Sequence, residues 1–270
     1  MISVLMSLYK KEEPGWFRKA LESITSAQER QPDEVVLVCD GPLTEELEKI
    51  ISDYEIAGCV PLRTVRLPEN KGLGIALGEG LKACRGELVA RMDTDDIAEG
   101  SRLRLQEEYM NAHEDVAACG GEIAEFINEG EIMRVKHMPS SPDQVYKYGK
   151  KRNPLNHMTV MFRKNAVMEA GNYQHFPLLE DYHLWSRMLA KGCRIANLDT
   201  VLVSARIGSS FAERRGGKDY YNWYKKLRHL QMEWGYLNRT EYLVSLALTF
   251  VMTRQSARSR ERAYKVLRSR

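Results

Sequence analysis

Several features that mark exported, zinc-binding and fibrous proteins are missing from this sequence of 270 residues. Its 5 cysteines are odd in number and widely spaced, and no two of them form a Cys-x-x-Cys pair, which excludes the common zinc and thiol redox motifs. The sequence also contains no internal repeat and no low-complexity segment. We therefore expect a globular protein in a reducing compartment.

A signal peptide and a long apolar run are missing as well. The run from Ile2 to Leu8 has no basic lead and no small-residue cleavage site, so we interpret it as a first strand. The apolar run from Tyr242 to Met252 covers 11 residues, whereas a helix that spans a bilayer needs about 20. The predicted location is therefore cytoplasmic.

Charge is distributed unevenly along the chain, although the formal net charge is only +3. Residues 214–270 contain 14 Lys and Arg against 4 Asp and Glu, whereas residues 1–213 contain 26 against 33. A basic end on an acidic body predicts an anionic partner such as a membrane surface, and a solvated helical face is the alternative. We expect no nucleic acid as partner, because the basic residues are not interleaved with aromatic residues that would stack on bases.

The first hundred residues alternate short β-branched runs with longer amphipathic segments. This alternation predicts an α/β fold with a doubly wound, mostly parallel central sheet. The expected strands are Ser3 to Leu8, Glu34 to Cys39, Leu62 to Leu67 and Glu87 to Met92. The expected helices are Trp16 to Gln28, Thr44 to Ile56 and Leu73 to Cys84. We place one large domain at 1–213 and a basic helical C-terminal extension at 214–270.

Three carboxylates, those of Asp93, Asp95 and Asp96, follow the last of these predicted strands. In parallel sheets ligands bind beyond the carboxyl ends of the strands. Carboxylates packed so closely raise one another's pKa, and a hard divalent cation such as Mg²⁺ or Mn²⁺ relieves this repulsion. The alternative is a helix N-cap at Asp95 or Asp96, ahead of the helix through Leu103.

Three further segments carry possible chemistry. Asp40 follows the second strand, although Asp-Gly-Pro is also ordinary turn chemistry. The glycine-rich helix start after Asn70 could approach phosphates, but Leu77 stands where the dinucleotide fingerprint has its third glycine. Glu180 and Asp181 open a helix that runs to about Lys191, either as a general base or as partners of the helix dipole.

Taken in order, these segments resemble the family-2 glycosyltransferases of the A-type fold, especially bacterial enzymes of capsule and O-antigen assembly. The resemblance covers about residues 1–210. It is carried by Asp40, the Asn70–Gly72 loop, Asp93–Asp96, the stretches His157–Phe162 and Gly171–Tyr173, and Glu180–Trp185.

The resemblance implies an inverting transfer from a nucleoside-diphosphate sugar, usually with UDP as the nucleotide. On the donor side it assigns Asp40 to the base, Asp93 to the ribose and Asp95 to a Mn or Mg ion on the diphosphate. Tyr9 and Lys71 complete the expected nucleotide site. Residues 1–100 would then form the nucleotide-binding half of the domain and residues 101–213 the acceptor-binding half.

On the acceptor side the resemblance makes Asp181 the catalytic base. Glu180 would orient the acceptor, Asp96 would be a secondary contact, and Trp185 would pack against sugar rings or lie in the core. Segments 204–210 and 213–217 stand where relatives have a loop that closes over the donor. Within it Arg206 could meet phosphates, although a surface arginine is the commoner interpretation.

Our main hypothesis is an enzyme of surface polysaccharide synthesis that uses a glycan or lipid-linked glycan acceptor at the cytoplasmic face of the membrane. The run Tyr242 to Met252 and the basic segment Arg254 to Arg270 would form a peripheral membrane anchor. One rival is a phosphatase or phosphotransferase with Asp93 as nucleophile and Asp95 as acid/base, although Ile97 stands where such enzymes usually show Thr or Val. The other rival is a non-catalytic nucleotide-binding module.

Overall fold

The computed structural model describes residues 1–207 and 216–255. Parts of the predicted closing loop and of the predicted basic anchor, at 208–215 and 256–270, lie outside the described residues. The strands are β1 (Ile2–Leu8), β2 (Glu34–Cys39), β3 (Leu62–Arg66), β4 (Leu88–Arg91), β5 (Ile97–Ala98), β6 (Val116–Phe126), β7 (Ile132–Lys136), β8 (Met161–Arg163) and β9 (Arg194–Arg206). The helices are α1 (Pro14–Ile24), α2 (Glu45–Ala57), α3 (Leu73–Ala83), α4 (Arg102–Ala112), α5 (Pro142–Gly149), α6 (Lys164–Glu169), α7 (Glu180–Ala190), α9 (Gly217–Glu233) and α10 (Arg239–Arg254), with a single 3₁₀ turn, η1 (His157–Thr159).

One sheet runs through the described part of the chain in the order β3-β2-β1-β4-β8-β6-β9-β5, and β7 pairs with β6 at its side. The strands β3, β2, β1 and β4 are parallel, which confirms the predicted strand-helix alternation of the first hundred residues. The second half mixes directions, because β8 is antiparallel to both β4 and β6 while β9 is parallel to β6. The predicted α/β class with a mostly parallel central sheet is confirmed.

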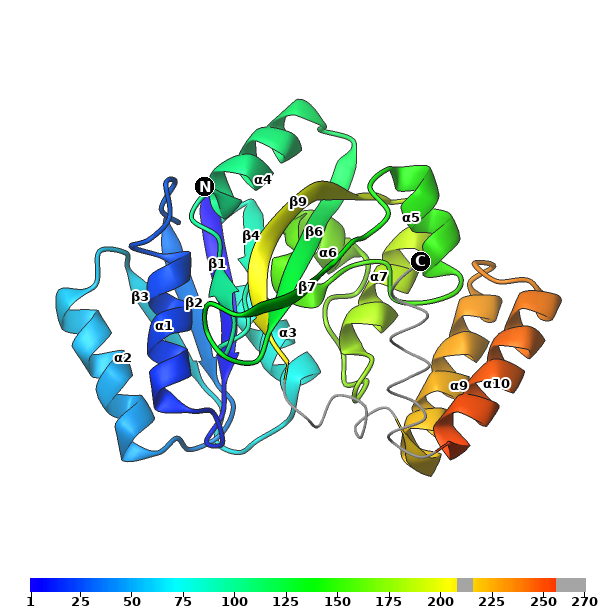
Figure 1. The fold of residues 1–270 in the computed structure, drawn as a ribbon, viewed down its shortest axis with the longest axis horizontal. Coiled ribbons are helices and arrows are strands. Elements are labelled where there is room, and N and C mark those ends of the chain that lie inside the picture. Colours follow the sequence, from blue (N-terminus) through cyan, green and yellow to red (C-terminus); the bar gives the residue numbers. More distant parts are fainter. Residues whose placement is uncertain (208–215, 256–270) are drawn as a thin grey trace.

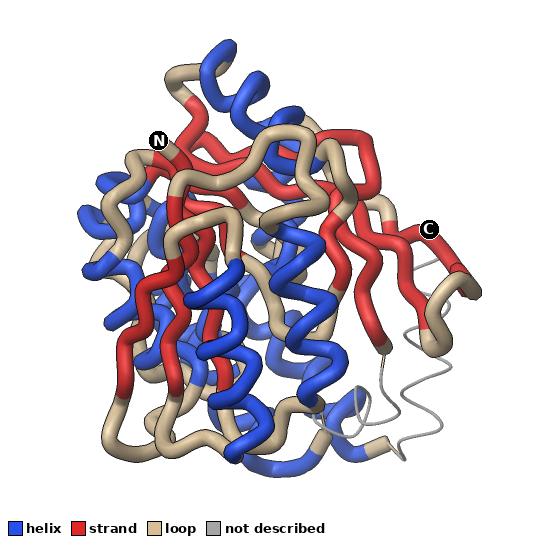
Figure 2. Tube along the Cα trace, turned by 90° about the vertical axis from the view of Figure 1, so that its left-hand side faces the viewer, coloured by secondary structure: helices blue, strands red, loops and turns tan. Residues whose placement is uncertain are grey.

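Helices cover both faces of the sheet (Figures 1 and 2). Successive strand residues point to opposite faces, so Val4 and Met6 pack with α1, α2 and α4, whereas Leu5 packs with α3, α6 and α7. Each face buries its own apolar cluster. The sheet is therefore doubly wound, and its carboxyl-end edge is left between the two helix layers.

Capping residues explain why two predicted helix starts differ from those of the structure. The first helix begins at Pro14 and not at Trp16, because the Glu13 side chain accepts a hydrogen bond from the Trp16 amide and proline suits the first helical position. The second begins at Glu45 because Thr44 is its N-cap and accepts from the Leu47 amide. Both elements exist as predicted, with boundaries shifted by one or two residues at these starts.

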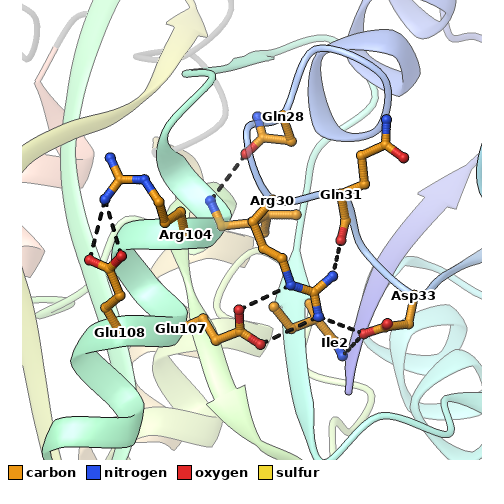
Figure 3. Close-up of polar contacts among 9 residues, drawn as sticks. Ile2, Gln28, Arg30, Gln31, Asp33, Arg104, Glu107 and Glu108 are labelled. Atoms are coloured by element: carbon orange, nitrogen blue, oxygen red, sulfur yellow. Dashed lines mark hydrogen bonds and ion pairs between the residues drawn. The ribbon is translucent and has the colours of Figure 1, made fainter.

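A cluster of ion pairs fastens α4 to the loop between α1 and β2 (Figure 3). Arg30 Nε lies 3.0 Å from Glu107 on α4, and Arg30 Nη2 lies 3.0 Å from Asp33, whose carboxylate also accepts from the Ile2 amide. Gln28 accepts from the Leu103 amide at the start of the same helix. These contacts hold the entry of β1 and β2 against α4.

The helices α9 and α10 form a pair at the far side of the molecule from α2 (Figure 1). Arg228 of α9 is 1% exposed and joins this pair to the rest of the fold. It donates to Ser245 of α10, to the Tyr182 hydroxyl of α7 and to the Lys150 carbonyl at the end of α5. The residues of 214–270 that are described are thus joined to the rest of the fold by hydrogen bonds of a buried side chain.

Within the described ranges, no helix has both the length and the apolar character that crossing a membrane requires.

Candidate active site

A cavity of about 1510 Å³ opens at the carboxyl-end edge of the sheet. Pockets for a single small molecule typically enclose roughly 300–1,000 Å³, so this one has room for two substrates. Its wall combines the ends of β1, β2 and β4 with residues of α5, α7, α9 and α10. Of the predicted site residues it contains Tyr9, Asp40, Asp93, Asp95, Asp96 and Asp181.

Asp93, Asp95 and Asp96 converge on one point of this cavity. One ligand oxygen of each lies within 4.8 Å of the others, a spacing at which a single cation can bind all three. Burial and the charge of Asp93 raise the pKa of Asp95 to about 6, and the same causes with the added charge of Asp95 raise the pKa of Asp96 well above its usual range. This repulsion is what a divalent ion would relieve, so the residues fit a metal.

The N-cap alternative for these aspartates does not hold. The next helix is α4, whose N-cap is Ser101, and a two-residue strand, β5, stands between it and the aspartates. Asp96 instead accepts a 2.8 Å hydrogen bond from the backbone amide of Arg206, which fastens the acidic cluster to the end of β9.

Arg206 is not a surface arginine, contrary to the commoner interpretation of its sequence position. Its side chain is 10% exposed and lies over the rings of Trp16 and Phe126, with centroid distances of 4.3 and 4.7 Å. It also pairs with Glu129 at 3.0 Å. Pairing and stacking over two aromatic rings desolvate the guanidinium next to Asp95 and Asp96.

Behind the acidic cluster lies a second arginine that the sequence did not single out. Arg91 is 2% exposed and forms an ion pair with Asp93, while its Nε and Nη1 have no hydrogen-bond partner among residues 1–207 and 216–255. Its charge and the burial of His157 both lower the pKa of that histidine, with burial the larger cause, so the ring is neutral at pH 7. His157 itself bonds to the Tyr173 hydroxyl at 3.0 Å.

Asp40 lies at the cavity, but its carboxylate is already engaged. It is 4% exposed and accepts from the amides of Lys71 and Gly72 at 2.7 and 3.0 Å. The turn alternative therefore describes part of its role, since Asp40 fixes the loop that leads into α3. The Lys71 side chain is exposed and does not line the cavity, whereas its neighbours Asn70 and Gly72 do.

The glycines of α3 have a packing role. A Cβ on Gly74 would lie 2.3 Å from the Gln174 carbonyl, and a Cβ on Gly78 would lie 3.0 Å from the Tyr173 carbonyl. Only glycine lets α3 approach the segment that leads into α7 this closely. The glycine-rich helix thus packs closely against the segment that leads into Glu180 and Asp181, and the phosphate contact suggested by its sequence stays a prediction.

Asp181 and Glu180 are adjacent but differ in surroundings. Asp181 lines the cavity and accepts a hydrogen bond from the Asn153 side chain, whereas Glu180 does not line it. Burial, followed by the charge of Asp181, raises the pKa of Glu180 to about 7. The preceding Leu178 has a φ of 69°, a left-handed conformation that is rare for such a side chain and is typical of functional turns.

Trp185 has no exposed surface. It is packed among Phe162, Tyr173 and His157 and is not in the cavity wall, so the core alternative describes it and a contact with sugar rings does not. It stands four residues after Asp181, hence on the same side of α7 but one turn further into the core, where it contacts Phe162 of β8.

The cavity also contains residues that sequence analysis passed over. Among them is a basic stretch at the end of α5 and just after it, with Lys147, Lys150, Lys151, Arg152 and Asn153 in the wall. The only signal in the sequence was the run of three basic residues before Asn153, which without the fold reads as a solvated loop.

Comparison with known proteins agrees with this geometry, because residues 3–174 match the family described as glycosyl transferase family 2. The chain belongs to glycosyl transferase family 2. It is 40% identical over 255 residues to the amylovoran biosynthesis glycosyltransferase AmsE of Erwinia amylovora, covering 93% of this chain and 94% of that protein. Family membership makes it a glycosyltransferase and removes the phosphatase and binding-module alternatives.

A second relative is named UDP-Gal:alpha-D-GlcNAc-diphosphoundecaprenol beta-1,3-galactosyltransferase, from Escherichia coli. This glycosyltransferase is 38% identical to it over 219 residues, which cover 81% of this chain and 78% of the relative. Both relatives match over most of their length, so the similarity extends well beyond residues 1–100.

Solved structures share the fold at low sequence identity. The S. aureus TarS fragment 1–349 in complex with UDP-GlcNAc aligns with a TM-score of 0.70 and 18% identity, covering 92% of this chain and 71% of that one. The mannosyltransferase PcManGT from Pyrobaculum calidifontis, in complex with GDP-Man and Mn²⁺, aligns with a TM-score of 0.61 and 16% identity, covering 98% and 79%. A divalent metal is thus bound in one structure of this fold.

Proposed function

We propose that this glycosyltransferase moves a sugar from a UDP-sugar to a hydroxyl of a lipid-linked glycan, with inversion at the anomeric carbon, in the synthesis of a surface polysaccharide. The observation that carries the proposal is that one cavity contains both the acidic cluster at the end of β4 and Asp181 at the start of α7. The names of the two relatives, in amylovoran biosynthesis and in transfer from UDP-Gal, support the polysaccharide and the donor.

On the donor side, Asp93 and Tyr9 would contact the nucleotide, and Asp95 would hold the metal with help from Asp96. Mn²⁺ or Mg²⁺ bound there would neutralise the charge that develops on the leaving diphosphate. Asp40 would act on the nucleotide pocket by holding the Asn70–Gly72 loop in place. The desolvated guanidinium of Arg206 would add positive charge beside the diphosphate.

On the acceptor side, Asp181 would take the proton of the attacking hydroxyl. The Asn153 amide donates to its carboxylate and so orients it toward the cavity. Attack from this side, opposite the leaving diphosphate, would invert the anomeric configuration. In this scheme residues 1–100 bind the donor, 101–213 bind the acceptor, and 214–270 form an extension that completes the wall.

The extension would also place the enzyme at the membrane where a lipid-linked acceptor is found. Leu243, Phe250 and Val251 of α10 are 61%, 43% and 57% exposed and lie along one face of that helix, which we call the outer face. An exposed apolar helix face in a chain with a basic end is typical of a peripheral membrane contact.

The test is calorimetric titration of UDP with and without Mn²⁺, on the wild type and on Asp95→Asn. Binding that requires the metal and is lost in Asp95→Asn is the expected result, and a screen of UDP-sugars with a diphospholipid-linked acceptor follows. Parallel titrations with GDP, CDP and dTDP identify the donor class. If none of the four nucleotides binds, the proposed donor site is wrong.

A further inference from the structure

The cavity extends well beyond the space between the acidic cluster and Asp181. Its far part is walled by the end of α5, by Tyr220 and Tyr224 of α9 and by one face of α10. Arg228 fixes these helices to one another through two buried hydrogen bonds and one partly buried hydrogen bond, so this wall is part of the folded body. The nucleotide end of the cavity is acidic, whereas the far part is basic on one side.

The basic side consists of Lys147, Lys150, Lys151 and Arg152. Lys150 pairs with Glu241 at 3.3 Å, and Arg152 stacks on the ring of Tyr148 at 5.4 Å. Lys147 and Lys151 are exposed, and across the described part of the chain neither takes part in an ion pair. Two cations without a partner at the mouth of a cavity predict an anionic ligand group there.

The wall beside it, on α10, is apolar, and the Lys150–Glu241 ion pair joins the two walls. Val244, Leu248 and Met252 follow one another at intervals of four along α10 and all line the cavity. Val244 is 53% and Leu248 is 64% exposed, which costs free energy unless an apolar group covers them. This inner face adjoins the outer face of the same helix, so the apolar surface continues from the cavity to the outside.

We propose that Lys147 and Lys151 bind the diphosphate of a polyprenyl-diphosphate-linked acceptor, and that Val244, Leu248 and Met252 hold the first isoprene units of its chain. A ligand with an anionic head next to a hydrocarbon chain matches two adjacent walls of which one is cationic and the other apolar. The sugar attached to the diphosphate then points along the cavity toward Asp181. This inference rests on the proposed function and gives its acceptor a binding site.

The experiment is a titration of farnesyl diphosphate in a neutral detergent, with the donor site filled by UDP and Mn²⁺. No anionic lipid is present, so binding of a membrane surface by the lysines cannot contribute. We expect Lys147→Glu and Lys151→Glu each to weaken binding by about tenfold or more, and Leu248→Ser by about fivefold. Inorganic diphosphate and farnesol should each bind more weakly than farnesyl diphosphate, because each has only half of the recognised chemistry.

Two matched controls lie outside the cavity wall. Lys225→Glu on α9 removes an exposed lysine, and Ile132→Ser on β7 removes an isoleucine that is 63% exposed against 64% for Leu248. Neither should change farnesyl diphosphate binding. UDP affinity, measured on every variant, reports whether the fold and the donor site are intact.

Unchanged binding in Lys147→Glu and Lys151→Glu, or equal weakening in Lys225→Glu, would overturn the diphosphate site. Equal affinities for inorganic diphosphate and farnesyl diphosphate would overturn the apolar part. Wild-type protein that binds UDP with Mn²⁺ but not farnesyl diphosphate also refutes the inference while leaving the donor site standing. Loss of UDP binding in the wild type would instead refute the proposed function.

Discussion

Adjacent carboxylates in this site differ because their immediate neighbours differ. Asp181 reaches the cavity and is oriented by Asn153, whereas Glu180 does not line the cavity and has a pKa of about 7, raised first by burial and then by the charge of Asp181. In the proposed reaction Asp181 would take a proton from the acceptor, whereas Glu180, with its raised pKa, would hold a proton inside the protein.

The first prediction concerns catalysis by this pair. Asp181→Asn should lower kcat by about 10² to 10⁴, because a positioned general base contributes that much, while UDP affinity changes less than about twofold. Glu180→Gln is the matched control, with the same change of charge one residue away, and should lower kcat by less than about tenfold. Steady-state kinetics and UDP calorimetry check both. If Glu180→Gln were as inactive as Asp181→Asn, the assignment of the base to Asp181 alone would be contradicted.

The second prediction concerns stability and pH in metal-free protein. The pKa of Glu180 is about 7 when folded and about 4.3 when unfolded, so its proton stabilises the fold below pH 4.3, and this stabilisation is lost as pH rises toward 7. The free energy of unfolding of Glu180→Gln, relative to that of the wild type, should therefore rise by on the order of 2 kcal/mol between pH 4 and pH 8. This figure allows for proton sharing with Asp181. Urea unfolding of both proteins at pH 4 and pH 8 measures this change. If the difference in unfolding free energy between variant and wild type were the same at both pH values, the prediction would be contradicted.

Among the elements, the helices behind the cavity depend on one buried arginine. Arg228 donates to groups on α5, α7 and α10, and its side chain has almost no contact with solvent. Removing it leaves the buried Tyr182 and Ser245 hydroxyls and the Lys150 carbonyl short of a donor, and each such group costs about 1–3 kcal/mol.

The third prediction follows from that accounting. Arg228→Met should lower the free energy of unfolding by about 3 kcal/mol, as for other buried polar networks broken on one side. Arg30→Met is the control, because Arg30 also makes several ion pairs (Figure 3) but is 32% exposed, so its loss should cost at most about 1 kcal/mol. Denaturant unfolding compares the two. If Arg228→Met and Arg30→Met lost equal amounts of unfolding free energy, burial of Arg228 would not be the cause of its contribution to stability.

The elements also show which parts of the fold local sequence determines. The strands β1, β2 and β4 were predictable because β-branched runs alternated with helical patterns, and Glu13 and Thr44 set the helix starts by capping. The pairing of β4 with β8, and of β6 with β9, was not predictable, because it joins segments about seventy residues apart with no local pattern that selects the partner.

At the scale of the whole molecule, the active-site cavity and the outer face of α10 meet along one helix. In the proposed reaction a lipid-linked acceptor would present its sugar to Asp181 while its chain remains in an apolar environment. The adjoining inner and outer faces of α10 provide a continuous apolar surface for this.

The fourth prediction tests the membrane contact. Replacing Phe250 and Val251 by serine should lower binding to vesicles that contain anionic lipid by about tenfold, because each removes an exposed apolar side chain from the outer face. Cosedimentation with vesicles measures the change. Ile132→Ser and Met133→Ser on β7 are the control, since these residues are 63% and 58% exposed on another surface and should leave vesicle binding unchanged. If both pairs of substitutions weakened vesicle binding equally, α10 would have no specific role in the membrane contact.

The sequence by itself determined the α/β class, the placement of Asp40 and Asp93–Asp96 at strand ends, and Glu180 and Asp181 at a helix start. These follow from local periodicity and from the rule that parallel strands end at one edge of the sheet. Only the tertiary structure decided that Trp185 lies in the core, that Arg206 is desolvated beside the acidic cluster, and that Lys147 and Lys151 line the same cavity as the apolar residues of α10. The physical reason is that burial, charge pairing and the shape of a cavity depend on contacts between side chains that are far apart in the sequence. Local sequence patterns do not predict these contacts.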